Sequence, residues 1–327
     1  MAKQRVLSGM QSSGRLHLGN LVGALQNWVR LQRDYDCYYF IADWHSLTTL
    51  YTDTSLIREN VKDVLINWLA AGIDPQKCTI FIQSRVLEHA ELHLLFSMIT
   101  PLGWLERVPT YKEKQEEIKD RDLGTYGFLG YPVLQSADIL IYRAQYVPVG
   151  IDQIPHLEIT REIARRFNFL YGNIFPEPEA MLTEFPKLPG IDGRKMSKSY
   201  GNAIYLSDPP KDVEQKLLTM MTDPARVKKT DPGEPEICPV FTMHKIFSSK
   251  EEQQFCASGC RTAGIGCIEC KRILIKNIFG VMEPIWEKRN ELLQHPDVLS
   301  DIVEEGIKKA RKAATVTMTM AREAMRI

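Results

Sequence analysis

The sequence predicts an α/β fold built on a doubly wound parallel sheet, followed by a helical region. Short apolar runs of strand length alternate with longer stretches of helical periodicity through the first half of the chain. Polar residues follow the ends of several of these runs, which is where doubly wound sheets bind their ligands. The alternation stops near Pro209, after which the pattern is helical, and a chain of 327 residues is long enough for two domains.

The first expected unit is strand, helix, strand, helix, strand. Each strand is a short apolar run, and each helix carries apolar residues at helical spacing. The helices return the chain to the same edge of the sheet, so the strands are expected to be parallel. We expect strands at residues 5–8, 38–43 and 79–83, and helices at residues 19–31 and 55–71.

A second unit is expected after a charged stretch at residues 112–122. A helix should open at Pro132, because proline is favoured in the first turn of a helix. A fourth strand is expected at residues 147–150 and a helix at residues 153–167. Residues 185–193 are rich in proline and glycine and lead into a lysine-rich loop.

The bulk composition is that of an ordinary soluble globular protein. The 41 basic residues balance the 41 acidic residues, which argues against a protein that coats nucleic acid by bulk charge. Basic clusters at residues 226–229 and 308–326 are either local RNA-binding faces or solvated helix faces. No apolar run is long enough to span a membrane, and residues 1–10 lack the pattern of a signal peptide, so we expect a cytoplasmic protein without a membrane partner.

The first candidate site is the loop at residues 9–20, between the first strand and the first helix. A helix N-terminus presents free N–H groups and the positive end of the helix dipole, and both favour phosphate. Gly19 lets a nucleotide approach the backbone closely, and His17 can donate hydrogen bonds to negative charge that develops on an α-phosphate. Taken alone, a His-x-Gly string near a helix start is a weak signal and usually indicates an ordinary loop histidine.

The second candidate site is the string KMSKS at residues 195–199, which lies between Gly193 and Gly201. Lys195 and Lys198 on a flexible loop can follow a pyrophosphate leaving group and neutralise its charge as it forms. An isolated Lys-x-x-Lys string would indicate a solvated basic loop. Here it follows an α/β half that begins with the string HLGN at residues 17–20.

Together, the two strings resemble the two signatures of class I aminoacyl-tRNA synthetases. The resemblance covers essentially the whole chain and narrows to the bacterial-type tryptophanyl members of that family. Asn20 stands where the generic signature has a histidine, as is common in tryptophanyl members, whereas Ile151 stands where many relatives carry an acid. Further matching strings lie at residues 9–25, 42–48, 105–107, 112–114, 131–140 and 147–150, and at Asp152 and Gln153.

The resemblance implies a tryptophan–tRNA ligase. Such an enzyme activates L-tryptophan with ATP, accompanied by Mg²⁺, to tryptophanyl-adenylate, and transfers it to the 3′ end of tRNA(Trp). It also implies a homodimer, a Rossmann-like catalytic domain at residues 1–205, a helical anticodon-binding domain at residues 206–300, and a C-terminal helix at residues 301–327 that packs back on the catalytic domain. Two alternatives remain open: a tyrosine–tRNA ligase, and a catalytically retired paralogue that binds RNA or senses redox state.

The resemblance also implies roles for individual residues of this chain. The expected catalytic residues are His17, Lys114, Lys195 and Lys198. The expected contacts to the amino acid are Gln11, His45, Tyr131, Gln135, Asp138, Val149 and Gln153, with His45 directed to the amino group or the acyl phosphate. The expected contacts to ATP are Gln11, Ser12, Ser13, Gly19, Asn20, Gly150, Ile151, Asp152, Lys195, Met196, Ser197, Lys198 and Ser199.

Asp138 is the residue expected to set specificity. An indole N–H can only donate a hydrogen bond, so its pocket needs an acceptor, and a carboxylate supplies a charge-assisted one. Asp138 stands in the apolar run at residues 133–140, where a buried carboxylate without partners would be costly. The alternative is a surface aspartate near Arg143.

Five of the seven cysteines lie between residues 238 and 270, which in a cytosolic chain suggests metal rather than disulfides. Two ligand sets are possible. Cys256, Cys260, Cys267 and Cys270 have the paired spacing of a Zn²⁺ site. Cys238, Cys260, Cys267 and Cys270 resemble the pattern of a subset of bacterial tryptophanyl synthetases that hold a [4Fe–4S] cluster, and this set is the favoured one. Cys256 is then a bystander, and unmetallated thiols are the remaining alternative.

Overall fold

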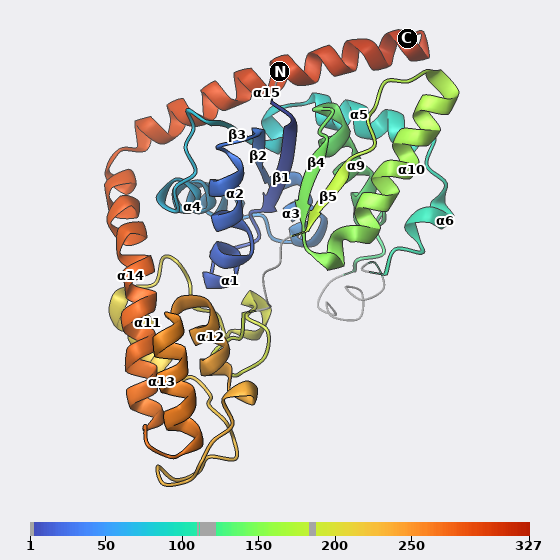
Figure 1. The fold of residues 1–327 in the computed structure, drawn as a ribbon. Coiled ribbons are helices and arrows are strands. Elements are labelled where there is room, and N and C mark those ends of the chain that lie inside the picture. Colours follow the sequence, from blue (N-terminus) through green and yellow to red (C-terminus); the bar gives the residue numbers. More distant parts are fainter. Residues whose placement is uncertain (1–2, 110, 112–121, 183–187) are drawn as a thin grey trace.

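The computed structural model describes residues 3–109, 111, 122–182 and 188–327. Within this part of the chain, five parallel strands form a single sheet in the order β3-β2-β1-β4-β5 (Figure 1). The strands are β1 (Arg5–Gln11), β2 (Asp36–Ala42), β3 (Cys78–Ile82), β4 (Tyr146–Val149) and β5 (Glu179–Leu182). The strand order reverses direction between β1 and β4, where ligands bind in doubly wound sheets. The predicted α/β class is therefore confirmed.

The central strands are buried because helices cover both faces of the sheet. All but the first residue of β2 are buried, which explains its nearly continuous apolar sequence. β2 pairs in register with β1 from Arg5 opposite Asp36 to Gln11 opposite Ala42. The edge strand β5 was not predicted, because its four residues are half-buried or exposed and carry little apolar pattern.

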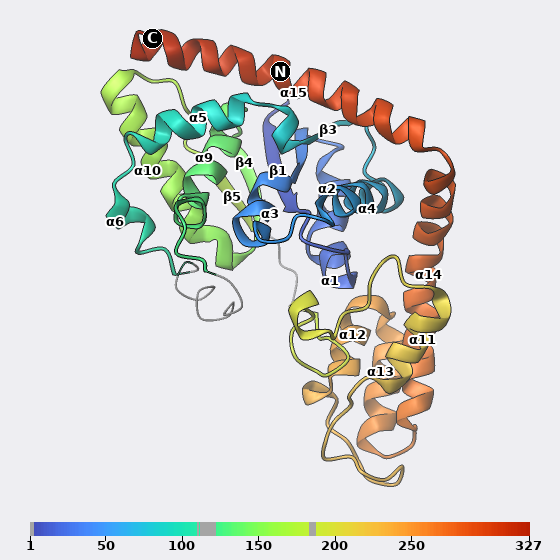
Figure 2. The ribbon, with the colours of Figure 1, turned by 180° about the vertical axis from the view of Figure 1, so that it is seen from behind.

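The helices of the first half lie on the two faces of the sheet (Figures 1 and 2). The predicted helix at residues 19–31 is present as one continuous helical segment. Within it, Leu21–Leu25 form a π-helical turn, the π-turn, in place of α-helix. Such turns often occur at functional sites. The helices are α1 (Leu18–Asn20), α2 (Gln26–Leu31), α3 (Asp43–Leu50), α4 (Ile57–Ala70), α5 (Glu88–Ser97), α6 (Leu102–Leu105), α8 (Tyr126–Leu129), α9 (Tyr131–Ile141) and α10 (Ile154–Tyr171).

The second half of the described chain is helical from Pro210 onward. Its helices are α11 (Pro210–Thr219), α12 (Pro239–Phe247), α13 (Lys250–Arg261), α14 (Cys267–Gln294) and α15 (Pro296–Met325), and short 3-10 turns lie at Gln83–Arg85, Ile151–Gln153, Lys198–Tyr200 and Pro235–Ile237. α14 contacts α4, where Arg289 forms an ion pair with Asp63 at 2.7 Å. No helix among the described residues is long and apolar enough to cross a membrane.

α15 crosses back over the sheet domain and contacts β3, α5 and α9 (Figures 1 and 2). Gly306 makes the close approach possible, because a Cβ atom there would lie 1.7 Å from the carbonyl oxygen of Ile80 in β3. The helix therefore covers the edge of the sheet that β3 would otherwise expose.

The close contact of α15 with β3 predicts that alanine substitutions at two glycines change the stability of the protein in opposite directions. Gly306→Ala should lower the free energy of unfolding by about 1–3 kcal/mol, because the added methyl group displaces the helix from the strand. Gly280→Ala is the matched control, because Gly280 is an exposed residue of α14 with no atom near its Cβ position. It should raise the same free energy by about 0.5–1 kcal/mol. Urea unfolding measures both, and a Gly306→Ala protein as stable as the parent would contradict the contact.

Candidate active site

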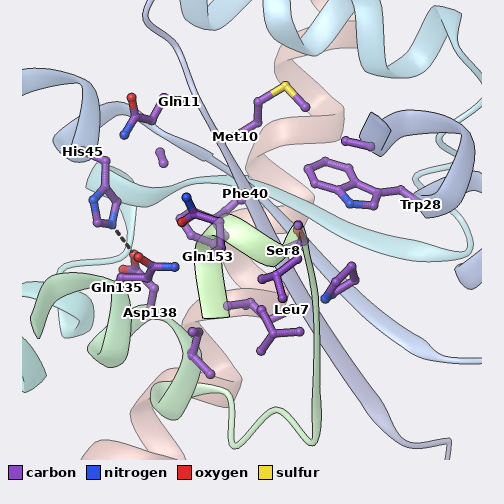
Figure 3. Close-up of a pocket in the computed structure, with 18 of the residues that line it drawn as sticks. Leu7, Ser8, Met10, Gln11, Trp28, Phe40, His45, Gln135, Asp138 and Gln153 are labelled. Atoms are coloured by element: carbon purple, nitrogen blue, oxygen red, sulfur yellow. Dashed lines mark hydrogen bonds and ion pairs between the residues drawn. The ribbon is translucent and has the colours of Figure 1, made fainter. Parts of the chain in front are cut away.

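A cavity of about 320 Å³ lies at the carboxyl ends of β1, β2 and β4, where the strand order reverses (Figure 3). A cleft of this volume can enclose a small molecule. Its walls come from β1, the π-turn and α2, β2, α3, α9 and β4. Of the residues expected to contact the amino acid or ATP, Gln11, His45, Tyr131, Gln135, Asp138, Val149, Gly150 and Gln153 line it.

Asp138, in α9, lies in the wall of this cavity and has no exposed surface. It accepts a hydrogen bond from His45 Nε2 at 2.7 Å, shown as a dashed line in Figure 3. A second comes from His89 Nδ1 at 2.6 Å. Gln83 Nε2 donates to both carboxylate oxygens, at 2.8 and 2.9 Å. The alternative of a surface aspartate near Arg143 is therefore wrong.

These donors keep the Asp138 carboxylate ionised. Burial by itself would raise the pKa of Asp138, but the hydrogen bonds from His45 and His89 outweigh it and hold the pKa below its usual range. His89 Nε2 in turn lies 2.7 Å from the hydroxyl of Tyr142. His89 therefore donates from Nδ1 to Asp138 and accepts at Nε2 from Tyr142, an assignment inferred from the network.

Sequence reasoning placed Gln83 at the end of a strand but missed His89 and Tyr142. Both are fully buried, in α5 and directly after α9. The sequence around His89 gives little indication of its role, because its partner Asp138 lies 49 positions away in the chain. Tyr131, which was expected at the site, is positioned by its own buried histidine, His156, at 2.7 Å.

The HLGN string begins α1, as the sequence predicted. The backbone N–H of His17 donates to Asn20 Oδ1 at 3.0 Å, which closes the first turn. Burial, followed by the charges of Lys198 and Lys195, lowers the pKa of His17 to about 4, so its imidazole is neutral near pH 7. Its Nδ1 atom is buried without a hydrogen-bond partner among the described residues. The ring is therefore neutral and carries one buried nitrogen without a partner among the described residues.

The KMSKS loop lies against the first signature. Lys198 Nζ donates to the carbonyl oxygen of Gly14 at 2.9 Å, so the two strings share one site although they are 184 positions apart. Burial lowers the pKa of Lys198 to about 8. With this pKa Lys198 stays mostly charged near pH 7, and a neighbouring anion would favour the charged form further.

Asn202 anchors the lysine loop and was missed by sequence reasoning. Its Oδ1 accepts from the backbone N–H of Ser197 at 2.8 Å, and its Nδ2 donates to the carbonyl oxygen of Lys195 at 3.1 Å. Met196 is buried beneath the loop. Two backbone contacts and one buried side chain therefore hold the loop from below, with Lys195 exposed and Lys198 turned toward Gly14.

The remaining expected residues lie around these two regions. Ser12 is buried and hydrogen-bonds to Ser46 at 3.1 Å. Ser13 is exposed, and Gly150 precedes the turn Ile151–Gln153 at the end of β4. The Ile151 side chain is 79% exposed, which agrees with a position that can offer only its backbone. Lys114 lies outside the described residues.

Four of the five clustered cysteines lie at the ends of three helices, and Cys256 lies within α13. Cys238 precedes α12, Cys260 is near the end of α13, and Cys267 and Cys270 are in the first turn of α14. All of them are free thiols. The ligand atoms of His244, Cys256 and Cys270 all lie within 4.8 Å of one another. This grouping differs from the favoured four-cysteine set, because it includes Cys256 and adds His244, which the sequence did not suggest.

Comparisons with known proteins agree on the family. Residues 1–280 match the family model described as tRNA synthetases class I (W and Y). The chain is 57% identical to a tryptophan–tRNA ligase of Thermotoga maritima over 325 residues, which cover 99% of each chain. It is 46% identical to the corresponding ligase of Aquifex aeolicus, with 99% of this chain and 100% of that one covered.

Solved structures are similar over the same length. A tryptophanyl-tRNA synthetase from Campylobacter jejuni, solved with ADP and tryptophan, superposes with a TM-score of 0.90. That pair is 36% identical and covers 99% of this chain and 100% of the other. A tyrosyl-tRNA synthetase from Archaeoglobus fulgidus has a TM-score of 0.67 at 22% identity, covers 88% of this chain and 90% of the other, and shares the fold alone.

The lowered pKa of Asp138 predicts a pH-dependent contribution to stability. A carboxyl group whose pKa is lower in the folded chain stabilises it fully above the unfolded-state pKa of about 4, and this stabilisation is lost as the pH falls further. The difference in unfolding free energy between the parent and Asp138→Asn should therefore be largest near neutral pH and shrink below about pH 4. Urea unfolding at several pH values measures it.

The matched control is Asp301→Asn, because Asp301 is exposed in α15. The difference in unfolding free energy between the parent and Asp301→Asn should stay constant across the pH range. A parent–variant difference for Asp138→Asn that stays constant down to the lowest pH at which the chain folds would contradict an ionised Asp138.

Proposed function

The chain belongs to the class I tRNA synthetases of the tryptophan and tyrosine family, and we propose that it is a tryptophan–tRNA ligase. It activates L-tryptophan with ATP to tryptophanyl-adenylate and transfers the tryptophanyl group to the 3′ end of tRNA(Trp). The observation that carries this function is the buried carboxylate of Asp138, which accepts hydrogen bonds from three side chains in the wall of a largely apolar cavity. Tryptophan-specific names among relatives that match almost the whole chain support it.

The amino acid occupies the cavity between β1, α9 and β4. The ring lies against apolar residues such as Leu7, Ile139 and Val149, and its N–H donates to Asp138. Gln135 and Gln153, which also line the cavity, are suited to the polar end of the amino acid. Because Asp138 is a hydrogen-bond acceptor, the cavity favours a ring that carries an N–H donor over a ring of the same shape that lacks one.

ATP lies between the two signatures, with its phosphates over the N-terminus of α1. The positive end of the helix dipole and the amino groups of Lys195 and Lys198 neutralise the phosphates, and His17 can face the α-phosphate. Mg²⁺ arrives with the phosphates of ATP, to which it binds with its own water molecules. The protein acts mainly through position and charge, because the attacking oxygen belongs to the amino acid itself.

Amino-acid-dependent exchange of pyrophosphate into ATP tests this function. The parent should exchange pyrophosphate with tryptophan and not with tyrosine. Asp138→Ala should slow the tryptophan-dependent exchange by roughly a hundredfold or more, because the ring loses its acceptor, while ATP binding measured separately changes little. Asp301→Ala serves as a control at a distant exposed aspartate.

Each alternative has its own outcome in the same assay. Exchange with tyrosine in place of tryptophan would identify a tyrosine–tRNA ligase. No exchange with either amino acid, together with retained tRNA binding, would identify a retired paralogue. Against the second alternative stands the preserved contact of Lys198 with Gly14, since a retired site has no need to keep it. Tryptophan-dependent pyrophosphate exchange by Asp138→Ala at the parent's rate would contradict the assigned role of Asp138.

We further infer that the cysteine-rich end of the helical region holds metal. The thiols of the five cysteines are soft donors that suit an iron–sulfur cluster or Zn²⁺, and the His244 imidazole beside Cys256 and Cys270 suits Zn²⁺. The sequence resemblance favours a [4Fe–4S] cluster on Cys238, Cys260, Cys267 and Cys270. The grouping of His244 with Cys256 and Cys270 is better suited to Zn²⁺, which binds imidazole and thiolate together.

Metal analysis of protein purified without oxygen separates the two metals. A cluster predicts a brown protein with about four iron atoms per chain. Cys238→Ser should lose the iron, and Cys256→Ser, the matched control, should keep it. A colourless protein with one zinc ion, lost in Cys256→Ser, would refute the cluster.

The chain is also inferred to be a cytoplasmic homodimer, as the resemblance implies. Large apolar side chains are exposed along α5, α6 and α8, and such surface often marks an interface between subunits. They are Leu87, Leu94, Met98, Leu102 and Tyr126.

Light scattering tests the oligomeric state. The parent should have the mass of a dimer, and the double variant Leu94→Glu, Met98→Glu should have the mass of a monomer, because buried carboxylates at an interface are costly. Phe169→Glu is the control, since Phe169 is exposed on α10 and apart from these helices in sequence. A monomeric parent, or a double variant that remains dimeric, would contradict the interface.

A further inference from the structure

The Asp138 carboxylate has no vacant acceptor position. Its Oδ1 atom accepts from His89 at 2.6 Å and from Gln83 at 2.8 Å. Its Oδ2 atom accepts from His45 at 2.7 Å and from Gln83 at 2.9 Å. An ionised carboxylate offers about four lone-pair positions, so all of them are used. Any N–H group that arrives at Asp138 must therefore replace a donor that is already there.

The three donors differ in their access to the cavity. Among the described residues that line it, His45 and Asp138 are present, whereas Gln83 and His89 are not. Gln83 and His89 have no exposed surface, and His89 is held from behind by the hydroxyl of Tyr142. Figure 3 shows His45 and Asp138 as neighbours in the lining of the cavity, with their side chains directed toward each other. The His45 side of Oδ2 is therefore the approach that a ligand can use.

We propose that the indole N–H of tryptophan replaces His45 at Oδ2 of Asp138, so that His45 limits how strongly the pocket discriminates for the ring N–H. Without such a ligand His45 satisfies the buried carboxylate, and it yields only to a ligand that donates at the same point. This exchange deepens the proposed function and rests on it.

The exchange has a consequence for selectivity. If Oδ2 lost a donor without a replacement, it would lose an interaction that keeps Asp138 ionised. Oδ2 therefore has a donor both with and without bound tryptophan. Tryptophan therefore exchanges one hydrogen bond for another. A ring of the same shape that lacks the N–H cannot replace His45. It must bind while His45 still donates to Oδ2, or displace His45 and leave Oδ2 without that donor. His45 thus lowers the gain that the indole N–H can contribute to binding.

Two ligands and two variants isolate this exchange. The ligands are tryptophan and its benzothiophene analogue, in which sulfur replaces the ring N–H. His45→Leu removes the donor, and His45→Gln is the matched control that keeps an N–H donor. The quantity measured is the ratio of the two dissociation constants, by calorimetry without ATP. Both ligands carry the same amino and carboxyl groups, so any contact that His45 makes with those groups cancels in the ratio.

The ratio, analogue over tryptophan, should rise about tenfold in His45→Leu relative to the parent, the equivalent of one charge-assisted hydrogen bond. In His45→Gln it should stay within about twofold of the parent, because the donor is retained. An unchanged or smaller ratio in His45→Leu would overturn the exchange. Absence of tryptophan binding to the parent would instead count against the proposed function itself.

A second measurement on the parent does not depend on a folded variant. In protein with ¹⁵N-labelled histidine, the Nε2 resonance of His45, assigned by its loss in His45→Gln, reports the hydrogen bond to Asp138. Tryptophan should shift this resonance strongly, and the saturating benzothiophene analogue should leave it near its unliganded position. Equal shifts with both ligands, or no shift with tryptophan, would overturn the exchange.

Discussion

A fully buried carboxylate stays ionised only when enough donors surround it, and the arrangement around Asp138 depends on that constraint. Its three donors come from three separate places: His45 from the start of α3, Gln83 from the end of β3, and His89 from α5. The parallel sheet brings the first two together, because β2 and β3 are paired and end at the same edge. α5 packs against α9 and brings the third. The fold therefore supplies a charged acceptor in the wall of a largely apolar cavity.

The phosphate-binding side of the site depends on a second long-range contact. Lys198 reaches the loop of the first signature at Gly14, and Asn202 fixes the backbone of the lysine loop. Burial lowers the pKa of both His17 and Lys198, so His17 is neutral near pH 7 while Lys198 stays mostly charged. An arriving polyphosphate would further stabilise the charged form of Lys198. The same residues can then neutralise the pyrophosphate as it leaves, without a protein nucleophile.

Much of the fold and part of the site could be predicted from the sequence. Strands β1 to β4 are apolar runs, and the HLGN and KMSKS strings carry their chemistry in consecutive residues. The contacts of His89, Tyr142 and Asn202 could not be predicted, because each is defined by a partner that tertiary structure supplies. The π-turn at Leu21–Leu25 and the edge strand β5 leave no periodic pattern. His244 was missed for a related reason: the cysteines gave a spacing signal, whereas a single histidine in α12 gave none.

The ionisation state of Asp138 is the central claim, and infrared spectroscopy tests it most directly. The difference spectrum between the parent and Asp138→Asn at neutral pH isolates the stretching bands of this one side chain. An ionised Asp138 predicts that the variant loses a carboxylate stretching band. Loss of the carbonyl band of a protonated acid would contradict the account, because a protonated Asp138 would itself be a donor and would not need the three that surround it.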